Sequence, residues 1–207
     1  DELNKSGIIY ERFSQLIRQY DLSAITVQCF KLIQKREATA CLALSKLSMD
    51  GVPAGCEGDI CSMLGMMITK ELFGIVPWMA NVNYVDESTR QATFSHCAVP
   101  GHLLKDFEIT THYESGIGQA VKGNLKTQEV TLVRIDSTLT KMFVGKGTLV
   151  PAEHSSQMCR TQVVVQGDED MVNYFTKNPL GNHHLIVPGD YLLGFKLAAH
   201  LLRMELV

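Results

Sequence analysis

The sequence lacks a Cys-x-x-Cys pair, a basic stripe and a long apolar run. Its six cysteines, at positions 29, 41, 56, 61, 97 and 159, stand mostly among apolar neighbours. That pattern is typical of buried free thiols in a reducing compartment, and it argues against a zinc knuckle. Lysines and arginines are scattered and the formal net charge is -3. The absence of a basic stripe interleaved with aromatics argues against nucleic acid as the main partner.

Membrane and secretion signals are also absent. The most apolar window, residues 192–202, is broken by Lys196 and His200 and is too short to span a bilayer. No signal-peptide pattern opens the chain, so we expect a cytoplasmic protein with no membrane partner. The chain starts at Asp1 without a methionine, in a helical pattern, and we expect it to be a piece of a longer polypeptide.

What is present fits a globular protein. With 207 residues, 45% of them hydrophobic and 20% charged, the chain can bury one generous core or two small ones. Disordered and collagen-like classes are excluded. No internal repeat or low-complexity linker divides the sequence.

The first 75 residues predict part of a parallel α/β layer. Apolar residues at spacings of three and four predict a helix over residues 2–20. A β-branched run over residues 23–30 predicts a strand covered on both faces. Helices are expected over residues 38–47 and 59–73. The Met-rich part of the latter, residues 63–68, is interpreted as core.

Residues 76–207 predict a second domain of β structure. Strands are expected at 76–84, 91–97, 107–113, 129–135, 141–149, 160–166 and 181–187. Alternation within these segments, with Gly or Asp turns between them, favours an antiparallel sheet closed or nearly closed into a barrel. Short helices are expected at residues 168–176 and 190–203.

One carboxylate has a special setting. Glu57 lies between Gly55 and Gly58, just before the helix that starts near residue 59. The glycines let the backbone turn or approach a ligand closely. Asp59 stands where an N-cap would be, which places Glu57 at the positive end of a helix. An ordinary acidic loop is an equally good interpretation of this segment alone.

Two histidine segments could add to such a site. Asn182, His183 and His184 precede an apolar strand, where one imidazole can face a metal or substrate while the other packs. A Cys-His hydrolase built on His96 and Cys97 is disfavoured, because neighbours in a strand point to opposite faces. We therefore interpret His96 as a residue that faces the barrel interior and either contacts a ligand or supports a residue that does.

These motifs together carry a family likeness. The Gly55-Cys56-Glu57-Gly58-Asp59 loop, the segments 78–81 and 94–97, and the Asn182-His183-His184 end resemble the C-terminal portion of the L-fucose isomerase and L-arabinose isomerase superfamily. The likeness covers essentially the whole chain and is strongest to fucose-isomerase-related proteins of unassigned substrate. It implies that residues 1–75 are the latter part of a middle α/β domain and residues 76–207 a C-terminal barrel, with the N-terminal domain absent.

The resemblance also implies a metal site. In fucose isomerases a Glu, an Asp and a His bind a divalent ion, usually Mn²⁺, and the two carboxylates shuttle protons. Glu57 and His183 match the first and last, although the arabinose isomerase pattern favours His184. The Asp position falls on Asn81, which supplies no charge and exchanges no proton. The ion would thus be weakly held, and Asn81→Asp is expected to tighten it.

The implied activity is conversion of an aldose to a ketose through an enediol, on a small monosaccharide. The catalytic residues would be Glu57 and Asn81, and the metal ligands would be Glu57, Asn81 and His183. Substrate contacts are assigned to Asn182, His184, His96 and Asp86, the last as a substitute carboxylate or a simple turn residue. The alternative is a carbohydrate-binding or regulatory relative that has lost turnover. The resemblance further implies a homo-oligomer when the protein is full length.

Overall fold

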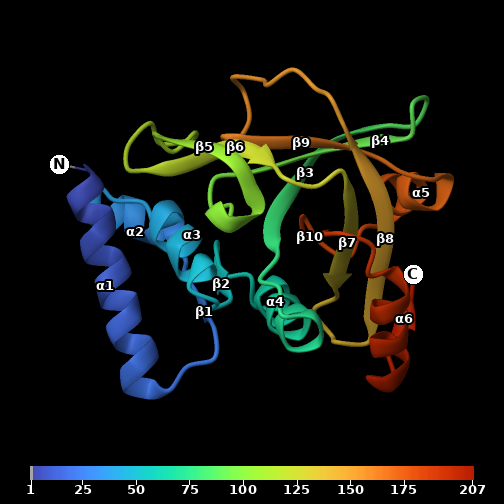
Figure 1. Ribbon diagram of the computed structural model, residues 1–207, viewed down its shortest axis with the longest axis horizontal. Coiled ribbons are helices and arrows are strands. Elements are labelled where there is room, and N and C mark those ends of the chain that lie inside the picture. Colours follow the sequence, from blue (N-terminus) through green and yellow to red (C-terminus); the bar gives the residue numbers. More distant parts are fainter. Residues whose placement is uncertain (1) are drawn as a thin grey trace.

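The computed structural model describes residues 2–207, which fold into helices at one end and a closed sheet at the other (Figure 1). The first part of the chain contains two short strands among four helices. These elements are α1 (Glu2–Tyr20), β1 (Ile25–Thr26), α2 (Cys29–Arg36), α3 (Cys41–Met49), β2 (Ala54–Gly55) and α4 (Ile60–Phe73). The predicted helices over residues 2–20 and 59–73 are thereby confirmed, and the parallel layer is reduced to the β1–β2 pair.

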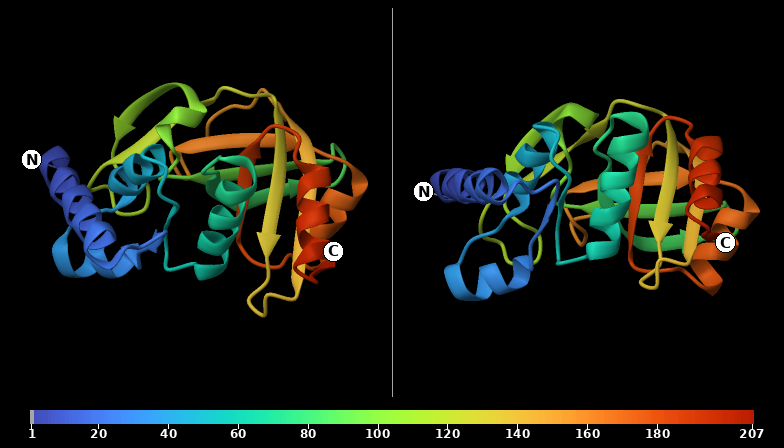
Figure 2. Two further views of the ribbon diagram at one scale, coloured as in Figure 1. Left: turned by 60° about the horizontal axis from the view of Figure 1, so that its bottom comes forward. Right: turned by 90° about the horizontal axis from the view of Figure 1, so that it is seen from below.

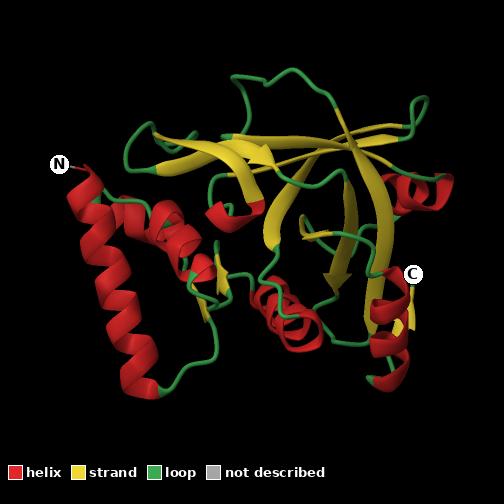
Figure 3. Cartoon of the chain, viewed as in Figure 1, coloured by secondary structure: helices red, strands yellow, loops and turns green. Residues whose placement is uncertain are grey.

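The remainder is mostly strands, drawn in yellow in Figure 3. Its elements are β3 (Trp78–Asp86), β4 (Gln91–His96), a 3-10 turn (Gly101–Leu103), β5 (Leu104–Thr110), β6 (Ala120–Leu125), β7 (Glu129–Ile135), β8 (Lys141–Val150), β9 (Thr161–Gln166), α5 (Glu169–Lys177), β10 (His183–Pro188), α6 (Leu192–Leu201) and β11 (Glu205–Leu206). Seven of these strands overlap the seven predicted ones, whereas β6 and β11 were not predicted.

The main sheet closes into a ring. Strands β8, β7, β10, β3, β4 and β9 follow one another, and β9 pairs again with β8. Every pairing within this ring is antiparallel, as the alternation predicted, while β11 adds to β8 in parallel. Strands β5 and β6 form a separate antiparallel pair. Closure leaves no free edge between β8 and β9.

The predicted strand over residues 23–30 is wrong for most of its length. Only Ile25 and Thr26 are extended, and Cys29 already begins α2. The loop after β2 folds back onto this segment, because the amide of Gly58 donates to the oxygen of Val27. The β-branched segment therefore forms a strand only where it can pair with β2, which is over two residues.

Two apolar clusters fill the interior. One lies within the ring and includes the fully buried Trp78, Phe94 and Ile186. The other joins the helical part to the ring, since Leu44 of α3 and Met66 of α4 pack in one cluster with Leu185 of β10. Figure 2 shows α4 between the N-terminal helices and the strands of the ring in both views. This packing fixes the start of α4 against β10.

Among residues 2–207, no helix combines the length and the apolar character needed to cross a bilayer.

Candidate active site

The loop between β2 and α4 projects Glu57 toward the ring. Glu57 adopts a left-handed backbone conformation with φ of 56°, which costs a side-chain-bearing residue about 1 kcal/mol or more. Hydrogen bonds on both sides hold it there, from the Gly58 amide to Val27 and from the Asp59 amide to Cys56. A backbone strained and fixed in this way is common at functional sites.

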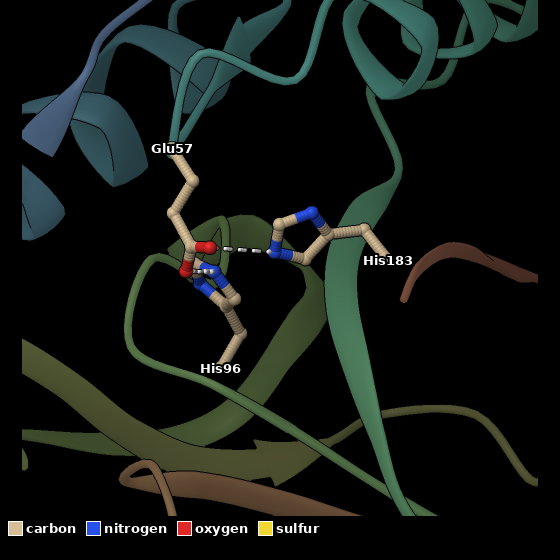
Figure 4. Close-up of side chains that lie close together, drawn as sticks. All are labelled: Glu57, His96 and His183. Atoms are coloured by element: carbon tan, nitrogen blue, oxygen red, sulfur yellow. Dashed lines mark ion pairs between the residues drawn. The ribbon is translucent and has the colours of Figure 1, made fainter. Parts of the chain in front are cut away.

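Two histidines from different strands face this carboxylate. Oε1 of Glu57 lies 3.7 Å from Nε2 of His96, at the end of β4, and Oε2 lies 3.5 Å from Nε2 of His183, at the start of β10. The rings of His96 and His183 meet edge to face with centroids 5.6 Å apart. One ligand atom from each of the three residues falls within 4.8 Å of the others (Figure 4). We call Glu57, His96 and His183 the central cluster.

Asp59 supports the cluster from behind. It caps α4, because its Oδ1 accepts from the amide of Ser62 at 2.9 Å. Its Oδ2 lies 3.0 Å from Nδ1 of His183 and 2.6 Å from a guanidinium nitrogen of Arg134. The same Arg134 nitrogen donates to the hydroxyl of Ser62. His183 therefore points its other nitrogen, Nε2, at Glu57.

The pKa values of Glu57, Asp59 and His183 are all shifted from their usual ranges. The imidazoles of His183 and His96 hold the pKa of Glu57 well below its usual range. Burial acts to raise the pKa of Asp59, but His183 and Arg134 outweigh it and keep that pKa well below normal. Burial opposes the charged form of His183, yet Asp59 and Glu57 raise its pKa to about 9. Without a cation, His183 thus carries a proton between two carboxylates.

His183 and Glu57 fit a bound divalent cation. Nε2 of His183 is buried and has no hydrogen-bond partner. A histidine whose Nδ1 proton goes to a carboxylate presents Nε2 as the metal-binding nitrogen, the usual arrangement behind a metal ligand. His96 differs, because its Nδ1 accepts the amide proton of Ala98 at 3.3 Å. Neutral His96 then carries its proton on Nε2, where it donates a hydrogen bond rather than ligating.

The adjacent His184 lies on the other face of β10. It is fully buried and its Nε2 lies 2.8 Å from the hydroxyl of Tyr174. Aromatic rings of Phe143 and Phe175 surround it, and burial lowers its pKa to about 3. The structure therefore brings His183, and not His184, to Glu57.

The two predicted asparagines lie next to the cluster. Asn81 is directly opposite His183 on the neighbouring strand β3, so the two side chains share a face. Its Oδ1 accepts a hydrogen bond of 2.6 Å from Nδ2 of Asn182. The carbonyl oxygen assigned to the metal from the resemblance is thus already engaged by a neighbour.

Asp86 lies elsewhere. It is five residues beyond Asn81 on β3, about 16 Å along the strand at the usual rise. There its Oδ1 accepts from Ser88 and Thr89 in the turn to β4. Of the two roles considered for Asp86 from the sequence, a substitute carboxylate or a turn residue, this placement fits the turn residue.

Cys97 is turned away from the cluster. It is 1% exposed and packs with Cys41, Ala120 and Cys159. His96, its neighbour, instead faces Glu57. The thiol of Cys97 and the imidazole of His96 therefore lie in different surroundings, the thiol beside Cys159 and the imidazole beside Glu57.

Sequence reasoning missed two residues of this site. Asp59 was recognised only as a helix cap, and Arg134 was not singled out within the strand expected at residues 129–135. An arginine that is 8% exposed in a strand of buried apolar residues signals a buried ion pair. Its partner could not be named, since Asp59 and Arg134 are 75 residues apart in the chain.

No family model matches the chain. Similarity to curated proteins supports its relationship to a sugar isomerase superfamily. The relatives are proteins named sulfoquinovose isomerase. That of Priestia megaterium is 28% identical over 166 residues, 73% of this chain and 37% of the relative. That of Alkalicoccus urumqiensis is 30% identical over 161 residues, 70% of this chain and 36% of the relative.

A third relative extends over more of the chain. Sulfoquinovose isomerase of Clostridium sp. strain MSTE9 is 22% identical over 210 residues, 95% of this chain and 46% of the relative. The chain thus spans less than half the length of these curated relatives. None of the three is named for fucose or arabinose, so the resemblance to those two enzymes stays a prediction.

Proposed function

We propose that this chain carries the active site of an aldose–ketose isomerase that acts on sulfoquinovose or a closely related sugar. The observation that carries the proposal is the central cluster, in which the two oxygens of Glu57 lie 3.7 Å from Nε2 of His96 and 3.5 Å from Nε2 of His183. The relatives named sulfoquinovose isomerase support both the reaction class and the substrate.

We further propose that Glu57 and His183 hold a divalent cation, with Mn²⁺ expected from the resemblance. A bound cation of this kind polarises the sugar oxygens next to the reacting carbons. Asp59 keeps the Nδ1 proton of His183, and Arg134 keeps Asp59 ionised, so that Nε2 is the nitrogen that faces the ion. Asn81, whose oxygen is already bonded to Asn182, adds no charge.

The proton chemistry belongs to the chain's own side chains. An ionised Glu57 can accept the proton from C2 of the open-chain aldose and return it to C1, which converts the aldehyde to a ketone through an enediol. His96 can donate its Nε2 proton as a hydrogen bond to a sugar oxygen, because Nδ1 is occupied by the Ala98 amide. Both histidines are buried, at 3% and 5% exposure, so their rings are held in place by the surrounding strands.

A second candidate function is sugar binding without turnover. It is favoured by the neutral Asn81 at the position where the resemblance implies a proton-carrying aspartate. Such a protein would keep the cluster and bind sugar but would give no ketose.

One assay separates the two. The protein is incubated with sulfoquinovose, L-fucose and L-arabinose, each with Mn²⁺ and with a chelator, and products are identified by NMR. The proposal expects a ketose from sulfoquinovose only when Mn²⁺ is present. Ketose from none of the sugars, together with measurable sugar binding, would favour the second function.

A further inference from the structure

The segment between β5 and β6, residues 111–119, lies beside the central cluster. Its Tyr113 packs against Cys97, the residue that follows His96. At the end of the segment, the amide of Val121 donates to the oxygen of Cys97 at 3.0 Å. At the start, the Arg160 guanidinium donates to the backbone oxygen of Thr111 at 2.8 Å. The residues on either side of Tyr113 are therefore fixed near His96.

Those two residues are His112 and Glu114, and they form a pair. Nδ1 of the buried His112 accepts the amide proton of Ser115 at 3.3 Å. The neutral imidazole then carries its proton on Nε2, which lies 3.7 Å from Oε2 of Glu114. The Glu114 side chain is 49% exposed. A buried imidazole thus lies within 4 Å of a carboxylate that is about half exposed to solvent.

Charged groups of the central cluster shift the pKa values of both Glu114 and His112. Burial and then the charge of Glu57 raise the pKa of Glu114. Burial and then the charge of His96 lower the pKa of His112, which keeps that imidazole neutral. A carboxyl group whose pKa is raised holds its proton more readily than an ordinary surface carboxylate, which suits a general acid.

The proposed reaction needs a second proton carrier besides Glu57. Interconversion moves one proton from C2 to C1 and another from O2 to O1. Glu57 can carry the first. Asn81 cannot carry the second because an amide does not exchange a proton near neutral pH. Asp59 cannot carry it either, since both Arg134 and His183 occupy its Oδ2.

We propose that Glu114 is the second proton-transferring residue, positioned by His112. This inference rests on the proposed function. As Glu57 accepts the proton from C2, the electrons of that C–H bond form the C1–C2 double bond of the enediol, and O1 takes a proton from the Glu114 carboxyl. The Glu114 carboxylate then accepts the proton of O2, the C2=O bond forms, and C1 takes back the proton held by Glu57. No oxidant or reductant is required.

The test compares Glu114→Gln with Glu108→Gln, both in the Mn²⁺-loaded protein. Glu108 is a matched control, because it is an exposed carboxylate of β5 that pairs with Lys122 away from this segment. Removing a general acid–base group costs about 10²- to 10⁴-fold in kcat. We expect that loss in Glu114→Gln with KM little changed, and wild-type kcat in Glu108→Gln. Electron paramagnetic resonance titration should give Glu114→Gln the Mn²⁺ affinity of the wild type.

A second variant guards against an indirect structural effect. In Glu114→Ala, added formate should restore part of kcat, because a small carboxylate can occupy the vacated position. A merely structural Glu114 would not respond to formate. An active wild type with unchanged kcat in Glu114→Gln, or no formate rescue, overturns this inference alone. A wild type that isomerises no sugar overturns the proposed function and this inference with it.

Discussion

At the scale of single residues, Asp59 has two separate roles. Its Oδ1 caps α4, and its Oδ2 orients His183. Asparagine is as good an N-cap as aspartate. Replacement by Asn therefore separates the two roles, since it keeps an oxygen for the cap and removes the charge behind His183.

We predict that Asp59→Asn weakens Mn²⁺ binding about 10- to 100-fold, the usual effect of losing a hydrogen-bonded carboxylate behind a metal-binding histidine. The free energy of unfolding without the ion should also fall, because the buried Arg134 keeps its charge and loses the carboxylate that pairs with it. Calorimetric titration and denaturant unfolding measure the two quantities. Asp50→Asn, at an exposed carboxylate that pairs with Lys46, is the control and should change neither. Unaltered Mn²⁺ affinity in Asp59→Asn would show that Asp59 only caps the helix.

The proton on His183 makes cation binding depend on pH. The folded protein raises the pKa of His183 to about 9, so a cation must displace that proton at neutral pH. Glu57 and Asp59 have pKa values well below their usual range and stay ionised. We predict that Mn²⁺ affinity rises about tenfold per pH unit up to pH 9 and then levels off, with about one proton released per ion.

Titration in buffers of different ionisation enthalpy counts the released protons. An affinity that does not change between pH 6 and 8 would mean that His183 is not a ligand.

At the scale of elements, helices and strands with several periods of an apolar pattern were predicted with the right bounds. Strands with a weak or interrupted pattern were not. The strand over residues 129–135 and the helix over 2–20 are confirmed with the predicted bounds, because each carries several periods of its apolar pattern. Strand β6 was missed, since Gly123 and Asn124 disfavour strands. In the structure, a Cβ at Gly123 would collide with the backbone of Asp106, so the glycine is what lets β5 and β6 pair.

The residues of the candidate site were likewise predictable only where a local sequence signal marked them. Local signals singled out Glu57 on its glycine loop and the Asp59 cap, and the resemblance added His183. The placement of Asn81 opposite His183, and of His96 beside Glu57, depends on strand register between segments far apart in the chain. Register is set by the whole sheet, and no local pattern near residue 57 encodes it.

Closure of the ring can be tested at Gly147 of β8. A Cβ there would lie 2.5 Å from the backbone oxygen of Gln166 on β9, so one of the two strands must shift. We predict that Gly147→Ala destabilises the protein by about 1–3 kcal/mol, the usual cost of overpacking. Gly7→Ala is the control. Gly7 lies within α1 with no neighbour inside 4 Å of a Cβ, and the change should stabilise by about 0.5–1 kcal/mol.

Denaturant unfolding of both variants gives these values. A Gly147→Ala protein as stable as the wild type would mean that β8 and β9 are not packed as described.

At the scale of the whole molecule, we predict that the intact protein self-associates. The resemblance implies oligomers with active sites near subunit contacts. The described residues also expose apolar side chains along α6, namely Leu193, Leu197 and Leu201. Contiguous exposed apolar surface of this kind favours association. Light scattering during size exclusion measures the mass, and a monomer at every concentration would contradict the prediction.

The central claim is that Glu57 moves the proton of C2. It is tested most directly by proton NMR of sulfoquinovose with the Mn²⁺-loaded protein in D₂O. The account predicts that deuterium from the solvent appears at C1 of the ketose, because the carboxyl of Glu57 can exchange the proton that it takes from C2, and that no ketose forms with Glu57→Gln. Glu71→Gln, at an exposed carboxylate of α4, should behave as the wild type. Ketose formation that continues undiminished in Glu57→Gln would contradict the account.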